Sequence, residues 1–264
     1  MSIYQVSKAG TKCRLTEYFK LWDALELDKE TMRIISITGA GGKTSVMFRL
    51  AEELQEMGRR VIVTTSTHIQ YPEHIKTVVL DHASQLGQIG WDGEILAAGG
   101  FVKEAAMPGS GEPCRKLGGM DLAEIAGLAD WCDVLLIEAD GSKRLPLKAP
   151  ADHEPVIIPE TDVVIGCAGL TCIGRTWEEG CFRPELARTL LQTSGWKTES
   201  VIRAGDVAHI LTDPSGTGKQ VGDRPFRIVL NQADGERELG LAMQTAQEIL
   251  RVKEIPISIT SELF

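Results

Sequence analysis

The chain has 264 residues, 43% of them hydrophobic, and a formal net charge of −9, so it can form a globular core of one large domain or two small ones. The negative charge, without any lysine- or arginine-rich block, argues against broad binding to nucleic acid. No apolar run approaches the length of a membrane span, and the N-terminus lacks a signal-peptide pattern. We therefore expect a cytoplasmic protein that binds neither nucleic acid nor membrane.

Residues 1–32 precede the first strong motif and are interpreted as a lead-in without recognisable chemistry. Mixed helical periodicity, with Tyr18, Leu21 and Leu25, predicts a helix over 15–27. Residues 33–264 contain no convincing linker and no internal repeat. They are interpreted as a single nucleotide-binding domain.

The strongest motif is a glycine-rich turn between a predicted strand over 33–38 and a predicted helix over 45–56. Glycines let the backbone approach an anion, and the first N–H groups of a helix, with its dipole, favour negative charge. In such a loop Lys43 contacts the outer phosphates, and the Thr44 hydroxyl ligates magnesium. The predicted nucleotide-binding residues of this turn are Gly39, Ala40, Gly41, Gly42, Lys43, Thr44 and Ser45.

The turn is shorter than the common P-loop pattern, which has a glycine five positions before its Gly-Lys pair. That position is Ile37 in this chain. The compact loop over 39–44 instead resembles the Gly-Thr-Asn-Gly-Lys-Thr loop of the Mur ligases, which also follows a strand ending in threonine. We therefore expect a P-loop NTPase-like α/β fold, nearest the Mur-type nucleotide domain, with a mostly parallel sheet and helices on both faces.

The next elements complete a βαβ unit. A strand is predicted over 61–65, and its polar C-terminal end should lie beside the phosphate loop. Further strands are predicted over 76–80 and 94–102, and a helix over 120–130. Residues 103–120 are rich in glycine and proline, with Lys103, Arg115 and Lys116 interspersed, and are predicted to form a mobile loop over the site.

The second strong motif is an apolar strand from Asp133 that ends in Glu138-Ala139-Asp140-Gly141. In P-loop proteins a strand of this kind supplies a carboxylate to magnesium or to its water shell. Glu138 and Asp140 alternate with Ala139, so both should point to the same side of the strand. The sequence does not decide between them, and both are interpreted as magnesium ligands together with Thr44.

A proline-containing loop over 142–159 carries further candidate groups. Lys143, Arg144 and Lys148 suit a clamp on a transferring phosphate or an anionic substrate. His153 and Glu154 are candidates for acid–base catalysis or metal ligation. With Lys43 and Asp140, these residues form the predicted catalytic set.

The C-terminal part contains predicted strands over 162–168, 226–230 and 255–259 and helices behind Pro184, over 205–212 and over 236–252. Residues 214–219 look like a second phosphate loop, but no strand precedes them, so they are interpreted as a turn. Asn231 and Asp234 follow a strand, as in the Asn-Lys-x-Asp motif that binds guanine, with Gln232 replacing the lysine. These features leave ATP and GTP equally open.

Taken together, the motifs resemble those of the YqeC-type family, which is associated with selenium-dependent hydroxylase maturation and selenium cofactor biosynthesis. The resemblance runs from the phosphate loop to the C-terminus. It rests on Gly39–Thr44, Val63–Thr67, Glu138–Gly141, Pro146–Pro150, His153–Pro155, Arg183–Glu185 and the Asn231/Asp234 pair.

The resemblance implies a nucleotide-dependent accessory factor for selenium-containing molybdenum hydroxylases, with the hydroxylase or its cofactor as partner. It also strengthens the assignment of Lys148, His153 and Glu154 to the site. None of the six cysteines forms a C-x-x-C motif, and most are interpreted as reduced, buried thiols. If any of them handles selenium, Cys172 and Cys181 are the first to test.

Three functions are compatible with these motifs. The first is an enzyme that binds magnesium with ATP or GTP and cleaves or transfers the γ-phosphate. The second is a nucleotide-switched carrier that delivers selenium or a molybdenum cofactor with little catalysis of its own. The third is a protein whose loop holds phosphate only structurally.

Overall fold

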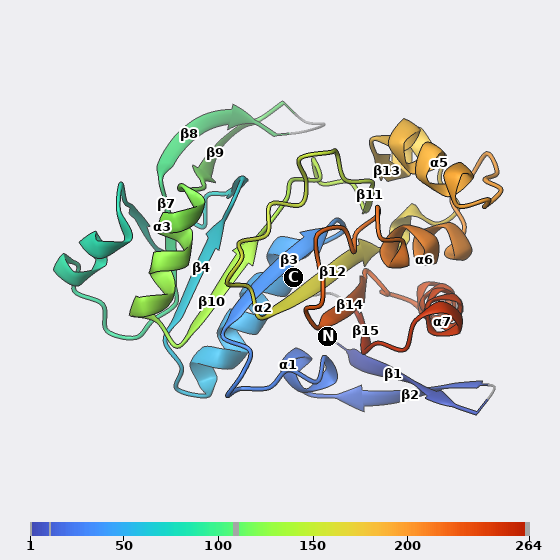
Figure 1. Ribbon diagram of the computed structural model, residues 1–264, viewed down its shortest axis with the longest axis horizontal. Coiled ribbons are helices and arrows are strands. Elements are labelled where there is room, and N and C mark those ends of the chain that lie inside the picture. The colour runs from blue at the N-terminus through green and yellow to red at the C-terminus, as the bar shows by residue number, and fades with distance from the viewer. Residues whose placement is uncertain (1, 11, 108–110, 262–264) are drawn as a thin grey trace.

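The computed structural model describes residues 2–10, 12–107 and 111–261 and has an α/β fold built around one long sheet (Figure 1). Within these residues, the sheet has ten strands. Their order is β2 (Lys12–Tyr18), β1 (Ile3–Ala9), β15 (Ile257–Thr260), β14 (Phe226–Asn231), β12 (Val163–Gly169), β3 (Ile34–Gly39), β10 (Val134–Glu138), β4 (Val61–Thr65), β7 (Leu96–Gly99) and β6 (Lys76–Val79).

Neighbouring strands from β15 to β6 run parallel, whereas β1 runs antiparallel to both β15 and β2. Two small sheets accompany the large one. The first joins β5 (His68–Gln70), β9 (Pro113–Gly118) and β8 (Phe101–Ala106), and the second pairs β11 (Leu147–Lys148) with β13 (Cys181–Phe182). The helices are α1 (Leu21–Ala24), α2 (Lys43–Glu56), α3 (Leu122–Gly127), α4 (Trp177–Gly180), α5 (Pro184–Thr193), α6 (Ala204–Thr212) and α7 (Glu236–Val252), with 3₁₀ turns η1 (Ala83–Gln88), η2 (Leu128–Trp131) and η3 (Leu170–Cys172).

Alternate residues of the parallel strands are buried against helices on opposite faces of the sheet. Ile35 and Ile37 of β3 belong to the apolar cluster that also contains α1 and α2. Val164 of β12 faces the other way, toward α6 and α7, while Ile137 of β10 packs toward α3. The predicted class is therefore confirmed: a P-loop NTPase-like α/β fold with a mostly parallel sheet and helices on both faces.

The N-terminal segment, interpreted from sequence as a lead-in, contributes β1 and β2 to the sheet. The helix predicted over 15–27 is wrong for residues 15–18, which lie in β2, and only Leu21–Ala24 are α-helical. Cys13 and Leu15 alternate with Arg14 and Thr16, and both pack against the apolar cluster beneath α7. This period of two residues is the pattern of a half-buried strand, and it overrides the weaker helical periodicity.

The irregular backbone predicted for residues 103–120 is also wrong over most of the segment. Strands β8 and β9 form an antiparallel hairpin that pairs with β5 and lies above β4 and β7 at the top of Figure 1. The hairpin is stabilised by Val102 and Leu117, which pair across it and pack against the cluster that includes α2. Residues 108–110, between the two strands in the sequence, lie outside the described residues. The strand predicted over 94–102 is in fact two strands, β7 and β8, separated at Gly100.

Residues 214–219 form turns, as predicted, and Thr217 packs behind the phosphate loop, where its carbonyl accepts a hydrogen bond from Thr38. No helix in the described part of the chain is long and apolar enough to cross a membrane.

A buried carboxylate joins α2 to the N-terminal segment. Glu53 is only 1% exposed and accepts hydrogen bonds from the backbone N–H groups of Leu21 and Trp22, at 2.8 and 2.9 Å. Its third partner is Arg49, at 2.7 Å. We expect Glu53→Ala to lower the free energy of unfolding by about 3 kcal/mol, because two buried N–H groups lose a charged acceptor. Chemical denaturation measures this change.

Glu56→Ala is the matched control, because this exposed carboxylate makes only a surface salt bridge with Lys20. We expect it to cost less than about 1 kcal/mol. Equal losses in the two variants would show that Glu53 does not hold the N-terminal segment in place.

Candidate functional site

The turn between β3 and α2 is a compact glycine loop. Gly39, Gly41 and Gly42 have φ angles of +92°, +69° and +107°, which favour glycine. A Cβ atom on Gly42 would lie 2.1 Å from Nδ2 of Asn231, and one on Gly41 would lie 2.0 Å from the backbone nitrogen of Gly169. The loop therefore needs glycine both for its backbone conformation and for its close packing against the C-terminal ends of β12 and β14.

Hydrogen bonds with the neighbouring strands β12 and β14 hold this loop in place. The N–H group of Ala40 donates to the Cys167 carbonyl at 2.9 Å, and Nδ2 of Asn231 donates to the Gly41 carbonyl at 3.0 Å. Asn231 also accepts a hydrogen bond from the Thr260 hydroxyl at 2.9 Å. The structure thus places Asn231 as a buried support of the loop, and its amide group is engaged by protein atoms.

The start of α2 is a set of unpaired donors. Among the described residues, the backbone N–H groups of Gly42 to Ser45 have no hydrogen-bond acceptor. Such groups at a helix N-terminus, together with the helix dipole, form an anion-binding site. The loop atoms that a phosphate needs are therefore available in this structure.

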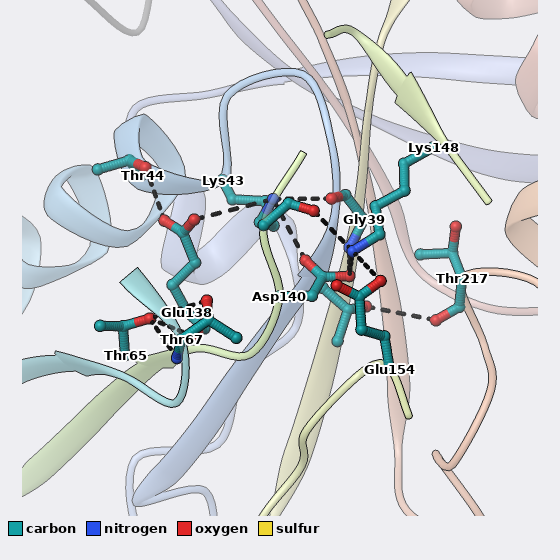
Figure 2. A network of polar contacts seen from close by, with 12 residues as sticks. Gly39, Lys43, Thr44, Thr65, Thr67, Glu138, Asp140, Lys148, Glu154 and Thr217 are labelled. Atoms are coloured by element: carbon teal, nitrogen blue, oxygen red, sulfur yellow. Dashed lines mark hydrogen bonds and ion pairs between the residues drawn. The ribbon is translucent and has the colours of Figure 1, made fainter. Parts of the chain in front are cut away.

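Lys43, the first residue of α2, lies inside the protein with 3% of its surface exposed (Figure 2). Its Nζ donates to the Gly39 carbonyl at 2.7 Å and lies 3.2 Å from Oδ1 of Asp140 and 3.8 Å from Oε1 of Glu138. Burial opposes the charge, but the carboxylates of Asp140 and Glu138 outweigh it and raise the pKa of Lys43. The ammonium group is therefore held ionised beside the loop.

Glu138 and Thr44 bring two side-chain oxygen atoms together at the edge of the cavity. The Thr44 hydroxyl donates to Oε2 of Glu138 at 2.6 Å. Burial raises the pKa of Glu138, although Lys43 and Thr44 oppose this shift. No group of three or more His, Cys, Asp and Glu side chains suited to a metal occurs in the described parts of the chain. A hydroxyl and one carboxylate nevertheless match the few protein ligands that magnesium takes beside phosphate oxygens and water.

Asp140 has different surroundings from Glu138. Its Oδ2 accepts a hydrogen bond from the Gly39 N–H at 3.1 Å and lies 2.9 Å from Nζ of Lys148. Its Oδ1 makes no hydrogen bond of good geometry, although the Lys43 ammonium group is close. The sequence left the choice between the two carboxylates open, and the structure puts Glu138, not Asp140, against Thr44.

A chain of alternating charges continues from Asp140. Lys148 is 1% exposed, and its Nζ lies 2.9 Å from both Asp140 and Glu154. Arg183 completes the chain with a salt bridge to Glu154. Burial disfavours ionised Glu154, but hydrogen bonds from Arg183 and Lys148 prevail and lower its pKa to about 2. The predicted residues Lys148 and Glu154 thus belong to the same ionic network as Lys43.

Lys143 and Arg144 adopt left-handed backbone conformations, with φ of +49° and +63°. Two consecutive non-glycine residues in this region cost on the order of 1–3 kcal/mol each. The Arg144 guanidinium contacts the Gln70 side chain, and Lys143 lies over the Phe182 ring, 5.2 Å from its centroid. Both exposed side chains line the cavity described next.

A cavity of about 900 Å³ unites these groups. Its walls are the start of α2, strand β5 with the loop after it, the β8–β9 hairpin and the turn after β10. This volume lies within the usual range of small-molecule sites. Among the predicted site residues it is lined by Gly41, Gly42, Lys43, Thr44, Ser45, Glu138, Lys143, Arg144 and Glu154.

Two predicted residues lie away from this cavity. His153 is exposed and does not line it, although Glu154 beside it does. Asp234 is also exposed and outside it, whereas Gln232, which replaces the lysine of the guanine motif, lines the cavity. The structure therefore places neither His153 nor Asp234 among the residues that line the cavity.

The cysteines are free thiols, and four of them are buried. Burial raises the pKa of Cys172 strongly and that of Cys181 to about 12, so neither is a thiolate near neutral pH. Cys114, by contrast, is half-buried and lines the cavity.

Sequence reasoning missed several residues of this cavity. Arg183 appeared only as part of a family motif, and Lys103 and Lys116 only as charges in a predicted loop. A sequence signal for Arg183 was its position immediately before Pro184, because proline favours the first turn of a helix. The polar residues Thr64 to His68 were expected beside the phosphate loop, and Thr67 and His68 do line the cavity, whereas no local pattern indicated that Gln70 of β5 would join them.

The fold and the glycine loop define a P-loop NTPase-like α/β protein. The family model described as "YqeC protein" matches residues 35–185. The chain is also 34% identical over 201 residues to the "Uncharacterized protein YqeC" of Escherichia coli (strain K12), with 71% of each chain covered. The chain therefore belongs to the YqeC family, as its motifs predicted.

The low pKa of Glu154 predicts a pH-dependent contribution to stability. Its folded-state pKa of about 2 is below the ordinary value of 4.5, so the contribution is complete above pH 4.5 and declines as pH falls toward 2. We expect wild type to exceed Glu154→Gln in unfolding free energy by up to about 3 kcal/mol at pH 7. Chemical denaturation between pH 7 and 3.5 should show this difference shrinking.

Glu185→Gln is the control, because Glu185 is largely exposed and makes a surface salt bridge with Arg188. Its effect should stay below about 1 kcal/mol at every pH. A Glu154→Gln difference that does not change with pH would contradict the ionised network.

Proposed function

We propose that this protein binds a nucleoside triphosphate with magnesium in the cavity and cleaves or transfers its γ-phosphoryl group. The observation that carries the proposal is the convergence of three features on one cavity. These are the unpaired N–H groups at the start of α2, the buried ammonium group of Lys43, and the Thr44–Glu138 pair. Together they offer donors, positive charge and magnesium ligands to a polyphosphate.

Each group has a distinct role in the proposal. The N–H groups of the loop over 39–45 and Lys43 hold phosphate oxygens, while Thr44 and Glu138 hold magnesium. Bound magnesium neutralises charge between the phosphates. Arg183 lines the cavity and is positioned to stabilise charge that develops on the transferred group.

Asp140 and Lys148 are assigned a supporting role, because neither of them lines the cavity. Lys148 fixes Asp140 and Glu154, and Asp140 in turn orients Lys43 and the N–H group of Gly39. This differs from a direct clamp of Lys148 on phosphate. The base can be adenine or guanine in the proposal, since Asn231 is engaged by the loop and Asp234 lies outside the cavity.

Membership of the YqeC family supports the cellular role that we propose. The protein would act in the cytoplasm as an accessory factor in the maturation of selenium-dependent molybdenum hydroxylases, with the hydroxylase or its cofactor as partner. Nucleotide turnover would drive that step.

The second candidate function is a nucleotide-switched carrier with slow hydrolysis. The β8–β9 hairpin favours it, because this element lines the cavity and pairs only with the short strand β5 among the described strands. In this case magnesium and nucleotide should change the protease sensitivity of residues 101–118. Identical digestion with and without nucleotide would leave the enzymatic function as the better account.

Phosphate release tests the proposed function. We expect wild type to release phosphate from ATP or GTP in a magnesium-dependent manner, and Thr44→Val to be at least ten-fold slower because it loses a magnesium ligand, a loss of about 1.4 kcal/mol in transition-state stabilisation. Release without added acceptor indicates hydrolysis, and release that needs a second substrate indicates transfer.

Thr193→Val is the matched control, because the Thr193 hydroxyl is exposed on α5 and bonds only to the Thr189 carbonyl. It should retain the wild-type rate. Equal rates of phosphate release in wild type and Thr44→Val would contradict the role of Thr44 as a magnesium ligand.

A further inference from the structure

The β8–β9 hairpin carries a pair of lysines that line the cavity. Lys103 of β8 and Lys116 of β9 are directly opposed across the antiparallel hairpin, and both line the cavity. Like charges at directly opposed positions destabilise a strand pair. An anion between the two side chains would remove that repulsion.

A neutral histidine lies beside Lys103. Nζ of Lys103 lies 2.8 Å from Nε2 of His68 on the adjacent strand β5, so His68 accepts the hydrogen bond as a neutral ring. Burial, Lys103 and Lys116 all lower the pKa of His68, which is consistent with positive potential at this wall. Lys116 has no salt-bridge partner among the residues that the structure describes.

Two more cations extend the same wall. Arg144 contacts Gln70, which is paired with Lys116 in the register of β5 and β9. Lys143 lies over the Phe182 ring. Across the described ranges, neither residue takes part in a salt bridge. Their left-handed backbones hold both side chains at the cavity against local preference.

The carboxylates of the cavity are already engaged. Glu73 pairs with Arg115 at 3.4 Å, Glu138 with Lys43, and Glu154 with Lys148 and Arg183. The four cations Lys103, Lys116, Lys143 and Arg144 are therefore the uncompensated charge of the cavity. They lie on segments other than the phosphate loop.

We propose that these four residues form a separate subsite for the carboxylate or phosphate group of a second small-molecule substrate. This inference rests on the proposed function, because the nucleotide would occupy the α2 side of the same cavity. A protein that transferred phosphate only to water would not need such a subsite. The second substrate is thus an anionic acceptor that lies between the hairpin and the nucleotide.

Anion titration tests the subsite, with inorganic phosphate and citrate as separate probes. Each probe is titrated by calorimetry into nucleotide-free protein and into protein saturated with magnesium and the β,γ-imido analogue of ATP or GTP. We expect saturable binding of one probe to both forms, weakened at least ten-fold in the double variant Lys103→Gln/Lys116→Gln. The probe that binds more tightly identifies the chemical class of the acceptor group.

The control double variant is Lys29→Gln/Lys197→Gln, which removes the same charge from exposed residues that neither line the cavity nor pair with a residue that does. It should bind the probe within two-fold of wild type. If the two double variants weakened probe binding equally, the effect would be one of net charge alone, and the proposed subsite would be wrong.

Lys43→Ala separates this inference from the proposed function. Probe binding that survives in Lys43→Ala but not in Lys103→Gln/Lys116→Gln supports the subsite, even if no nucleotide binds. Probe binding that is lost in Lys43→Ala, or abolished by the nucleotide analogue, assigns the anion to the phosphate loop and overturns the subsite. Absence of saturable binding to wild type also overturns it.

Discussion

The site depends on one buried charge, the ammonium group of Lys43. A cation with 3% of its surface exposed is unfavourable unless anions accompany it, and here Asp140 and Glu138 do so from the neighbouring strand. For these two carboxylates to reach the Lys43 ammonium group, β3 and β10 must be adjacent, the loop must be made of glycines, and α2 must begin at Lys43. Lys148, Glu154 and Arg183 continue this ionic network away from the loop. Each buried ion of the network therefore lies beside an ion of opposite charge.

The parts of this arrangement that sequence could predict are local in the chain. The strand, the glycine turn, Lys43 and α2 are contiguous, and Glu138 and Asp140 end a strand whose apolar run is obvious. The rule that strand ends meet at one edge of a parallel sheet was enough to bring these two segments together. The α/β class and the helices on both faces followed from the same alternation of strands and helices.

The parts that sequence did not predict depend on tertiary contacts. Nothing local distinguishes Glu138 from Asp140, because the difference lies in which of them meets Thr44 and which meets Lys148. The glycines and prolines of the β8–β9 segment indicated a loop, so the hairpin was not predicted. The packing of Val102 and Leu117 that stabilises the hairpin is a tertiary contact, which the sequence does not show. Strand β2 was missed because its apolar residues are few and only half-buried.

The most direct measurement is a calorimetric titration of ATP and GTP, with and without magnesium, into wild type and Lys43→Ala, after circular dichroism has shown that the variant is folded. We expect saturable, magnesium-dependent binding of at least one nucleotide to wild type, and affinity at least a hundred-fold lower in the variant, since the loop would lose the buried ammonium group that lines the cavity. Unchanged affinity in Lys43→Ala, or no binding of either nucleotide to wild type, would contradict the assignment of this cavity to a nucleotide.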